Sequence, residues 1–383
     1  MKVIDMSKRA IASAGLEPAT GPAHGAVESI EKVLSAAGLA PRGATAVECT
    51  ENIDTMARCT GRPATHAGAA PRRPNVVASS EGAGEFVSRS FRNTAGRRTY
   101  KLYVPPGDVA GSGGIPLVVM LHGCKQSPHD FAAGTRMNAL ADKHGFLVAY
   151  PEQVANVYGS KCWNWFRRGD QGRDRGEPSI IAGITCEVAA EHSVDPDRIF
   201  VAGLSAGAAM AVILGATYPE LYAAVGAHSG LPYGAAYNML SALGAMNGRG
   251  TLGGVARPSG NPSAGHPSSE TGVPTIVFHG DKDRTVHPRN GAAIVEQATA
   301  GRTAETRLRT SVREGLDGGG RRHRQTVHAD AAGRPVVEQW DLLGAGHAWS
   351  GGSPDGSFTD AAGPDASAEM VRFFSAQPRL CAA

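Results

Sequence analysis

Three residues in the second half of the chain have the types and the order that nucleophilic hydrolysis requires. Ser205 lies in the segment 203–207, which reads Gly-Leu-Ser-Ala-Gly and joins a β-branched apolar run to an Ala-rich run. Strand, sharp turn and helix in that order form a nucleophile elbow, which exposes the serine hydroxyl above the sheet. A Gly-x-Ser-x-Gly match can also arise by chance in a chain with 50 glycines. The flanking strand and helix patterns favour the catalytic interpretation of Ser205.

A serine is a weak nucleophile, so it needs a base to accept its proton and a carboxylate to orient that base. In α/β-hydrolases the chain order is serine, then acid, then histidine. Asp283 follows an apolar strand in a Gly-x-x-Asp turn and is the candidate acid, with Asp281 as the alternative two residues earlier. His347 follows the last apolar strand in a glycine-flanked loop and is the candidate base. Ser205, Asp283 and His347 are therefore the predicted catalytic triad.

Hydrolysis through a tetrahedral intermediate also needs two N–H donors for the developing oxyanion. The residue after the nucleophile, Ala206, is expected to supply one of them. The loop that follows the apolar run 116–121 reads His-Gly-Cys-Lys-Gln, and the N–H of Cys124 is the expected second donor. His122 in the same loop is expected to be a buried histidine that binds loop carbonyls. The predicted mechanism is acyl-enzyme chemistry without a metal or a cofactor.

Apolar runs typical of buried strands alternate with helical patterns from residue 85 onward. A hairpin over 86–104 comes first, turned at 93–96. The alternation predicts an α/β fold with a doubly wound, mostly parallel sheet, to which the hairpin adds an antiparallel N-terminal edge. Residues 85–378 form the predicted catalytic domain. The expected strands are 116–121, 146–150, 199–202, 222–227 and 273–278, the expected helices are 134–144, 179–193, 206–217 and 290–299, and a hairpin turn is expected over 315–324.

Two stretches depart from this alternation. Residues 1–84 are dominated by Ala, Gly, Pro and Thr, and they are predicted to form a flexible arm with one short helix. Residues 231–271 interrupt the catalytic domain. A helix over 235–246 there is expected to act as a lid or acyl-site wall, with a plain surface loop as the alternative. The Gly/Pro/Ser-rich part over 249–269 is expected to be such a loop.

Composition and charge exclude several classes of protein. A hydrophobic content of 42% is enough for a sizeable core. The formal net charge is only +3, and the basic residues are scattered rather than grouped with aromatics, so nucleic-acid binding has no support. No stretch approaches the roughly 20 apolar residues of a transmembrane helix. Residues 1–9 contain no long apolar segment, so no secretory signal is legible and a cytoplasmic location is expected for the sequence as it stands.

Six separated motifs are rich in glycine, aromatic or reactive side chains. They are Leu-His-Gly-Cys-x-Gln at 121–126, Tyr-Pro-Glu-Gln at 150–153, Cys-Trp-Asn-Trp-Phe at 162–166, Gly-Leu-Ser-Ala-Gly-Ala-Ala-Met at 203–210, His-Ser-Gly at 228–230 and Gly-His-Ala-Trp-Ser-Gly-Gly at 346–352. In this order, over roughly residues 85–375, they resemble the polyhydroxybutyrate (PHB) depolymerase family of esterases. The resemblance implies an α/β-hydrolase fold with Ser205, Asp283 and His347 as the triad.

The resemblance also implies the kind of substrate. It suggests a serine esterase acting on short 3-hydroxyacyl esters, such as poly(3-hydroxyalkanoate) or 3-hydroxybutyrate oligomers. A feruloyl, acetylxylan or aryl esterase is the alternative, because the broader family includes such enzymes. From a different class, a catalytically silent protein that binds polyester granules is a further alternative, against which the intact triad argues. Secreted family members make an extracellular location the alternative to the cytoplasm.

Further roles follow only from the motif positions. Cys124 and Cys162 each lie in a family motif and are expected either to form a disulfide or to stay reduced in the cytoplasm. Cys186 falls in a predicted helix and is expected to be a small buried hydrophobe. Trp163 and Trp349 flank motif loops and are expected to form part of an apolar wall for the acyl chain, with ordinary packing as the alternative.

Overall fold

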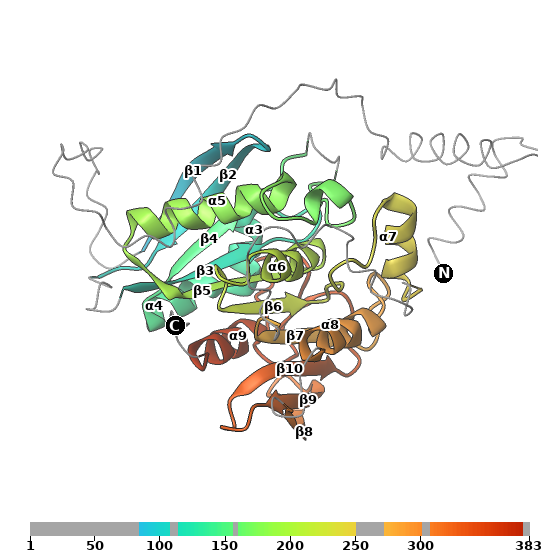
Figure 1. The fold of residues 1–383 in the computed structure, drawn as a ribbon. Helices are drawn as coiled ribbons and strands as arrows, with labels where there is room; N and C mark the ends of the chain where they lie inside the picture. The colour runs from blue at the N-terminus through green and yellow to red at the C-terminus, as the bar shows by residue number, and fades with distance from the viewer. Residues whose placement is uncertain (1–83, 108–113, 156–159, 250–271, 301–306, 378–383) are drawn as a thin grey trace, which may run out of the picture.

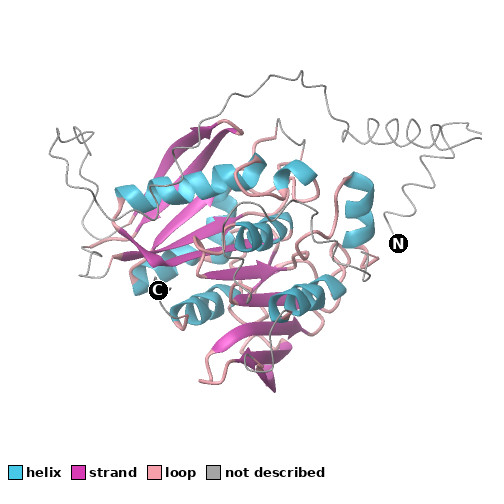
Figure 2. Ribbon diagram, viewed as in Figure 1, coloured by secondary structure: helices cyan, strands magenta, loops and turns pink. Residues whose placement is uncertain are grey.

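Ten strands of the described residues form one sheet (Figures 1 and 2), in the order β1-β2-β4-β3-β5-β6-β7-β10-β9-β8. The computed structural model describes residues 84–107, 114–155, 160–249, 272–300 and 307–377. The arm predicted over 1–84 lies outside these ranges apart from Gly84. The strands are β1 (Glu85–Asn93), β2 (Gly96–Val104), β3 (Ile115–Leu121), β4 (Leu147–Pro151), β5 (Val194–Leu204), β6 (Ala224–His228), β7 (Thr275–Gly280), β8 (Arg309–Leu316), β9 (Arg322–Ala329) and β10 (Pro335–Leu342).

The strand directions confirm the predicted fold class. The neighbours β4, β3, β5, β6, β7 and β10 are all parallel. At the N-terminal edge, β1 and β2 form the expected antiparallel hairpin, and β2 runs antiparallel to β4. The opposite edge is antiparallel as well, since β8 and β9 form a hairpin on β10. Only the turn of this second hairpin was expected from the sequence. Two short strands, β11 (Trp349–Ser350) and β12 (Thr359–Asp360), pair separately.

Helices cover both faces of the sheet, because the central strands are apolar on both sides. In β3, Leu117, Val119 and Leu121 pack with one set of helices, whereas Val118 and Met120 pack with the other. Helices α5 and α6 cover the first face near β3, α8 continues that cover over β7 and β10, and α3, α4 and α9 cover the second face. The helices are α3 (Pro128–Thr135), α4 (Met137–His144), α5 (Gly176–Glu191), α6 (Ala206–Thr217), α7 (Met239–Met246), α8 (Arg289–Thr299) and α9 (Ala366–Ser375), with a short 3₁₀ turn η2 (Arg168–Asp170).

The carboxyl ends of the parallel strands carry the loops that the sequence singled out. β3 leads into the segment 122–126, β5 into the turn at Ser205, and β7 into the turn that contains Asp283. In a parallel sheet these ends meet at one edge, where ligands bind. Helix α7 follows β6 at the same edge. It begins at Met239 rather than at residue 235, because Asn238 caps its first turn in a capping box.

None of the helices within the described ranges is both long and apolar enough to cross a membrane.

Candidate active site

Ser205 occupies a strained turn between β5 and α6. Its φ of 58° and ψ of −118° lie where few residues other than glycine are found. Its N–H donates to the His228 carbonyl oxygen at 2.9 Å, which ties the turn to the end of β6. A Cβ on Gly203 would lie 2.6 Å from the Gly207 oxygen, and one on Gly207 would lie 2.6 Å from the His122 oxygen. Both glycines are therefore required for strand and helix to approach so closely.

Asp283 and His347 meet across the loops that follow β7 and β10. Nδ1 of His347 lies 2.7 Å from Oδ2 of Asp283. The other carboxylate oxygen accepts the N–H groups of Thr285 at 2.8 Å and Val286 at 2.9 Å. This pairing places a ring hydrogen on Nδ1 of His347 and leaves Nε2 as the proton acceptor. The structure therefore brings an acid and a base together in the arrangement that a serine nucleophile needs.

Asp281, the alternative acid, has a different partner. Its side chain is exposed, and its Oδ1 accepts the N–H of Gly344 at 2.6 Å. Gly344 lies in the loop that carries His347. Asp281 therefore holds the backbone of this loop, whereas Asp283 contacts the imidazole itself.

The carboxyl of Asp283 has a pKa below its usual range. Burial acts in the opposite direction, because desolvation disfavours the charged form. Hydrogen bonds from His279, from His347 and from the Val286 N–H outweigh this effect of burial. His279 is buried near the end of β7, and its Nε2 lies 2.9 Å from the Val286 oxygen and 3.5 Å from Oδ2 of Asp283. The carboxylate thus stays ionised where it faces His347.

His228, the last residue of β6, holds the chain just beyond His347. Its Nε2 accepts the Ser350 N–H at 3.0 Å. Its ring stacks on Trp349 and on Phe278, with centroids 5.1 Å and 5.7 Å away. Burial lowers the pKa of His228 to about 3, so the ring is neutral at neutral pH and can accept that hydrogen bond. Sequence reasoning placed this residue in a motif but gave it no role, and the motif was its only signal.

The loop after β3 lies beside the elbow, because Leu121 at the end of β3 pairs with Gly203 in β5. The N–H of Gly123 donates to Oε1 of Gln126 at 2.9 Å, and the N–H of Gln126 donates back to the Gly123 oxygen at 3.3 Å. These two bonds close a tight turn. Within the turn, the N–H of Cys124 has no acceptor among the described residues.

Ala206 is the first residue of α6. The first four N–H groups of a helix have no partner inside the helix, and they carry the positive end of its dipole. The Ala206 N–H is therefore free for an external acceptor, as the Cys124 N–H is. Two backbone donors on adjacent strand ends are what an oxyanion needs.

His122 fixes the same loop from inside the protein. Its Nδ1 lies 2.8 Å from the Gly123 oxygen, and its Nε2 accepts the Gln153 N–H at 3.0 Å. Its own carbonyl oxygen accepts the indole N–H of Trp163 at 3.0 Å. Burial lowers the pKa of His122 to about 4, which keeps the ring neutral. The expectation of a buried histidine bound to loop carbonyls is confirmed.

A buried carboxylate, Glu177 in the first turn of α5, supports this arrangement from behind. The carboxylate oxygens of Glu177 accept two hydrogen bonds from Asn164, from its backbone N–H at 2.7 Å and from its side-chain Nδ2 at 2.8 Å. They also accept hydrogen bonds from Nε2 of Gln153 and, at 3.3 Å, from Nη2 of Arg98. Burial raises the pKa of the Glu177 carboxyl, and Asp170 adds to this effect while the hydrogen bonds oppose it. Sequence reasoning missed Glu177, because its partners lie 13 to 79 residues away.

Cys124 and Cys162 form a disulfide, which joins the loop after β3 to the segment that contains Trp163. Their Cα atoms lie 4.3 Å apart, and 38 residues separate them in sequence. Cys186 on α5 is disulfide-bonded as well. The expectation that Cys186 is merely a small buried hydrophobe is therefore wrong.

Trp163 and Trp349 do not form the predicted apolar wall for an acyl chain. Their side chains are 0% and 1% exposed, which leaves no surface for a substrate. Each indole N–H also has an internal acceptor, the His122 oxygen for Trp163 and the Ser367 hydroxyl, at 3.0 Å, for Trp349. Both rings pack in the core, which was the alternative considered for them.

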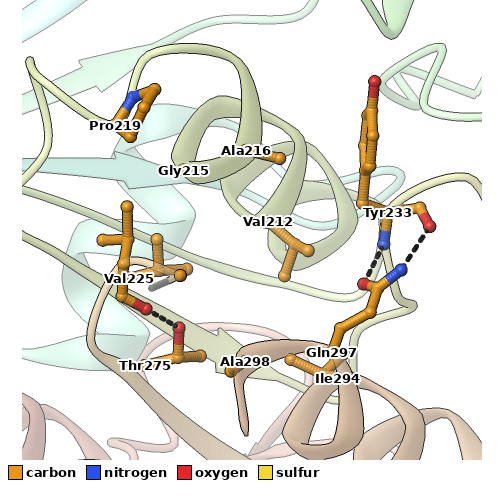
Figure 3. A pocket seen from close by; sticks show the side chains of 12 residues that line it. Val212, Gly215, Ala216, Pro219, Val225, Tyr233, Thr275, Ile294, Gln297 and Ala298 are labelled. Atoms are coloured by element: carbon orange, nitrogen blue, oxygen red, sulfur yellow. Dashed lines mark hydrogen bonds between the residues drawn. The ribbon is translucent and has the colours of Figure 1, made fainter. Parts of the chain in front are cut away.

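A separate pocket of about 300 Å³ lies between α6 and α8 (Figure 3). It adjoins the carboxyl-terminal half of α6, away from Ser205, and it contains no predicted site residue. Tyr233 and Gln297 close one side, since the Tyr233 N–H donates to Gln297 Oε1 at 2.9 Å and Gln297 Nε2 donates to the Tyr233 oxygen at 2.7 Å. Most of the other lining side chains are aliphatic, among them Val212, Ala216, Val225, Val273, Ile294 and Ala298.

Comparison with known protein families adds a decisive observation. The Esterase PHB depolymerase family matches residues 98–306, more than half of the chain. The chain belongs to the PHB depolymerase family. The match begins in β2 and includes the elbow, Asp283 and the loop after β3. The family resemblance drawn from the six motifs is therefore confirmed.

Individual relatives of this chain include a depolymerase and an acetylxylan esterase. Poly(3-hydroxyalkanoate) depolymerase C of Paucimonas lemoignei is 36% identical over 283 residues, which are 73% of this chain and 65% of that protein. Probable acetylxylan esterase A of Aspergillus fumigatus is 30% identical over 217 residues, which are 55% of this chain and 57% of that protein. The chain thus spans less than two thirds of the length of either relative.

Among solved structures, acetyl xylan esterase from Aspergillus awamori aligns with a TM-score of 0.58 and 19% identity, over 77% of this chain and all of that one. This likeness supports an α/β-hydrolase fold for this chain.

Proposed function

We propose that this protein is a serine esterase that hydrolyses carboxylic esters through an acyl-enzyme. The observation that carries the proposal is the Asp283–His347 hydrogen bond of 2.7 Å at the same sheet edge as the strained Ser205 elbow. An ionised acid that orients a neutral imidazole is the arrangement that activates a serine hydroxyl. Membership of the PHB depolymerase family supports the same class of reaction.

The proposed first step forms the acyl-enzyme. Nε2 of His347 accepts the proton of the Ser205 hydroxyl while Oγ attacks the ester carbonyl carbon. The carbonyl oxygen becomes an oxyanion, which the N–H groups of Cys124 and Ala206 stabilise. When the C–O bond to the alcohol breaks, His347 returns its proton to the leaving oxygen. Asp283 remains ionised and stabilises the imidazolium in between.

The second step releases the acid. Water loses a proton to His347 as it attacks the acyl carbon, and the same two N–H groups hold the second oxyanion. The bond to Ser205 Oγ then breaks, and Oγ recovers the proton from His347. The products are a carboxylic acid and the free serine.

For the substrate, we propose esters of short 3-hydroxyalkanoic acids, in a polymer or in oligomers. The relative named poly(3-hydroxyalkanoate) depolymerase C supports this choice, with 36% identity over 73% of the chain. An acetylxylan-type esterase is the second candidate, because relatives of that name reach 30% identity. The Trp163 and Trp349 rings do not discriminate between the two, since both are buried.

We also propose that the protein works in an oxidising compartment. Disulfides persist in secreted and periplasmic proteins and are rare in the cytosol. The Cys124–Cys162 bond, together with the disulfide at Cys186, supports an extracellular or periplasmic location over the cytoplasmic one expected from residues 1–9.

Acid release by the purified protein tests these proposals. The substrates are amorphous poly(3-hydroxybutyrate), acetylated xylan, methyl ferulate and p-nitrophenyl butyrate, each with Ser205→Ala as the blank. Polymer hydrolysis that disappears in Ser205→Ala is the expected result. Activity on the xylan or the soluble esters alone would overturn the polyester proposal and leave a small-ester or acetylxylan-type esterase. No Ser205-dependent activity on any substrate would overturn the esterase proposal and favour a silent binder.

A further inference from the structure

Helix α7 and the residue before its cap present large apolar side chains to solvent. Tyr237, Leu240 and Leu243 are 58%, 66% and 51% exposed. Leu240 and Leu243 are three residues apart and so share one face of the helix. A Cβ on Gly244, beside Leu243, would meet no atom within 4 Å, so this face is open. Three large hydrophobic residues are thus exposed within seven positions, and exposed apolar surface gathered in this way can mark an interaction site.

The segment that carries the patch has no charged side chain of its own, although the Arg168 guanidinium lies over the Tyr237 ring, 5.4 Å from its centroid. Residues 231–248 contain no Asp, Glu, Lys, Arg or His, although 19% of the whole chain is charged. The exposed apolar residues of strand β8, in contrast, have charged neighbours. Val312 and Leu316 on β8 are 57% and 68% exposed, but they lie in a strand that also carries Arg309, Arg313 and Glu314.

The patch is held rigidly at the catalytic edge of the sheet. The carbonyl oxygens of Ala245 and Met246, at the end of α7, accept Nδ2 of Asn290 at 2.9 Å and the N–H of His287 at 2.7 Å. His287 lies four residues after Asp283. The buried side of α7, with Ala242 and Ala245, belongs to the same core as α6. In Figure 1, α7 stands at the margin of the domain, beyond the ends of the central strands.

We propose that the α7 patch, formed by Tyr237, Leu240 and Leu243, docks on the surface of a solid, uncharged aliphatic polyester. The inference rests on the proposed polyesterase function. A solid polymer offers the enzyme a hydrophobic surface rather than a dissolved molecule, so a fixed apolar contact beside the triad keeps ester bonds within reach. Helices that lie on membranes usually carry Lys or Arg on their polar face, and α7 has neither. Leu240 and Leu243 thus lie on a helix without charged residues, and the nearby Arg168 already contacts the Tyr237 ring, so a polyester surface is favoured over a lipid one.

The test compares two double variants on the same polymer. Leu240→Ser/Leu243→Ser removes the centre of the patch, and Val312→Ser/Leu316→Ser removes equally exposed apolar residues on the β8 hairpin. Because all four side chains are exposed, both variants should keep the thermal midpoint of the parent protein. Each is made in the active chain and in the Ser205→Ala background, in which adsorption is measured without hydrolysis.

The expected result is a selective loss on the solid. Adsorption of the patch variant to poly(3-hydroxybutyrate) films should weaken by at least tenfold, since burial of each leucine is worth about a tenfold change in affinity. Its ratio of film hydrolysis to p-nitrophenyl butyrate hydrolysis should fall by a similar factor. The β8 control variant should keep both values.

Four results would overturn the proposal. Equal film adsorption of the patch variant and the parent would remove the docking role. An equal fall on film and on soluble ester would assign α7 to the catalytic pocket instead. A change from dimer to monomer in sedimentation would identify the patch as an interface between copies. Weakened binding to phosphatidylglycerol vesicles with unchanged film binding would indicate a lipid surface.

The same experiment separates this proposal from the substrate proposal. If the parent protein hydrolyses soluble esters but not the polymer, the substrate proposal fails. Film adsorption in the Ser205→Ala background still tests the patch in that case.

Discussion

Replacing both cysteines of the Cys124–Cys162 pair by serine is expected to lower stability by about 4 kcal/mol. The bond joins residues that are 38 apart in sequence. Closing a loop of that length in the unfolded chain removes about 13 cal/mol/K of entropy, which is about 4 kcal/mol at 25 °C. An unfolding entropy of roughly 2.1 cal/mol/K per residue over about 290 residues converts this loss into a fall of roughly 6 °C in Tm.

The catalytic effect should have a distinct signature. Cys124 supplies a proposed oxyanion donor, and the bond fixes the turn in which its N–H has no acceptor among the described residues. Removal of a whole oxyanion donor costs about 10² to 10³ in kcat, so a loosened donor should cost less than that. We expect kcat on p-nitrophenyl butyrate to fall about tenfold with little change in KM, because the donor acts mainly in the transition state.

The assay is thermal and urea unfolding of Cys124→Ser/Cys162→Ser, together with steady-state kinetics. Substitution is preferable to a reductant, because Cys186 is disulfide-bonded as well and a reductant would break more than one bond. Each single variant should lose nearly the same stability as the double variant, since either one removes the bond. An unchanged Tm in the double variant would refute the loop-closure argument. A fall in Tm with unchanged kcat would refute the link between the disulfide and the oxyanion loop.

Three further predictions concern single side chains. Asp283→Asn should lower kcat by about 10³ to 10⁴, because Asp283 contacts the His347 imidazole. Asp281→Ala should lower kcat less than about tenfold, because the Asp281 side chain accepts only the Gly344 N–H. Ester kinetics on both variants measure the difference, and equal losses would contradict the assignment. Glu177→Gln should cost about 2 to 4 kcal/mol in urea unfolding, because the buried Arg98 guanidinium loses the negative charge of its ion-pair partner and keeps its hydrogen bond to the Arg97 oxygen. A loss below about 1 kcal/mol would contradict this role. The pKa of His122 is about 4 in the folded protein and near 6.5 in the unfolded chain, so the unfolded chain binds more protons between these values. The free energy of unfolding therefore falls as pH drops from about 6.5 to about 4, by up to about 3 kcal/mol. In His122→Gln, urea unfolding at pH 7 and pH 4 should show a loss that is smaller by that amount.

The parts of the site that are contiguous in sequence were the ones that could be predicted. The elbow at Ser205 needs only a strand, a Gly-x-Ser-x-Gly turn and a helix, and all three lie within about twenty residues. The choice between Asp281 and Asp283 is different. Both follow β7 in one turn, and their partners come from the loop after β10, more than sixty residues later. Only the path of that loop decides which carboxylate meets His347.

Burial could not be read from motif position. Trp163 and Trp349 lie in motif loops, and amphipathic rings at such places often line a binding site. Here the indole N–H groups find acceptors inside the protein, so both rings can be buried completely. The acceptors are the His122 carbonyl and the Ser367 hydroxyl, 41 and 18 residues away. Contacts at such separations leave no periodic pattern in the sequence.

The second antiparallel edge was missed for a related reason. Nearly all of β8 is exposed, so the strand has no buried face to impose alternating apolar residues. Its ladder with β9 depends on backbone hydrogen bonds and on cross-strand pairs such as Arg324 with Glu314, at 3.1 Å. Only the glycine-rich turn between the two strands could be recognised.

Two neutral histidines perform the same task for two loops of the candidate site. His122 accepts the Gln153 N–H behind the loop after β3, and His228 accepts the Ser350 N–H behind the loop that carries His347. A protonated ring could not accept either bond, so burial and the lowered pKa values are part of how the loops are held. The Asp283 carboxyl has hydrogen-bond donors on both oxygens and needs no such neutral partner. As pH falls, protonation of His122 and His228 should therefore displace the loop after β3 and the loop that carries His347 before Asp283 loses its charge.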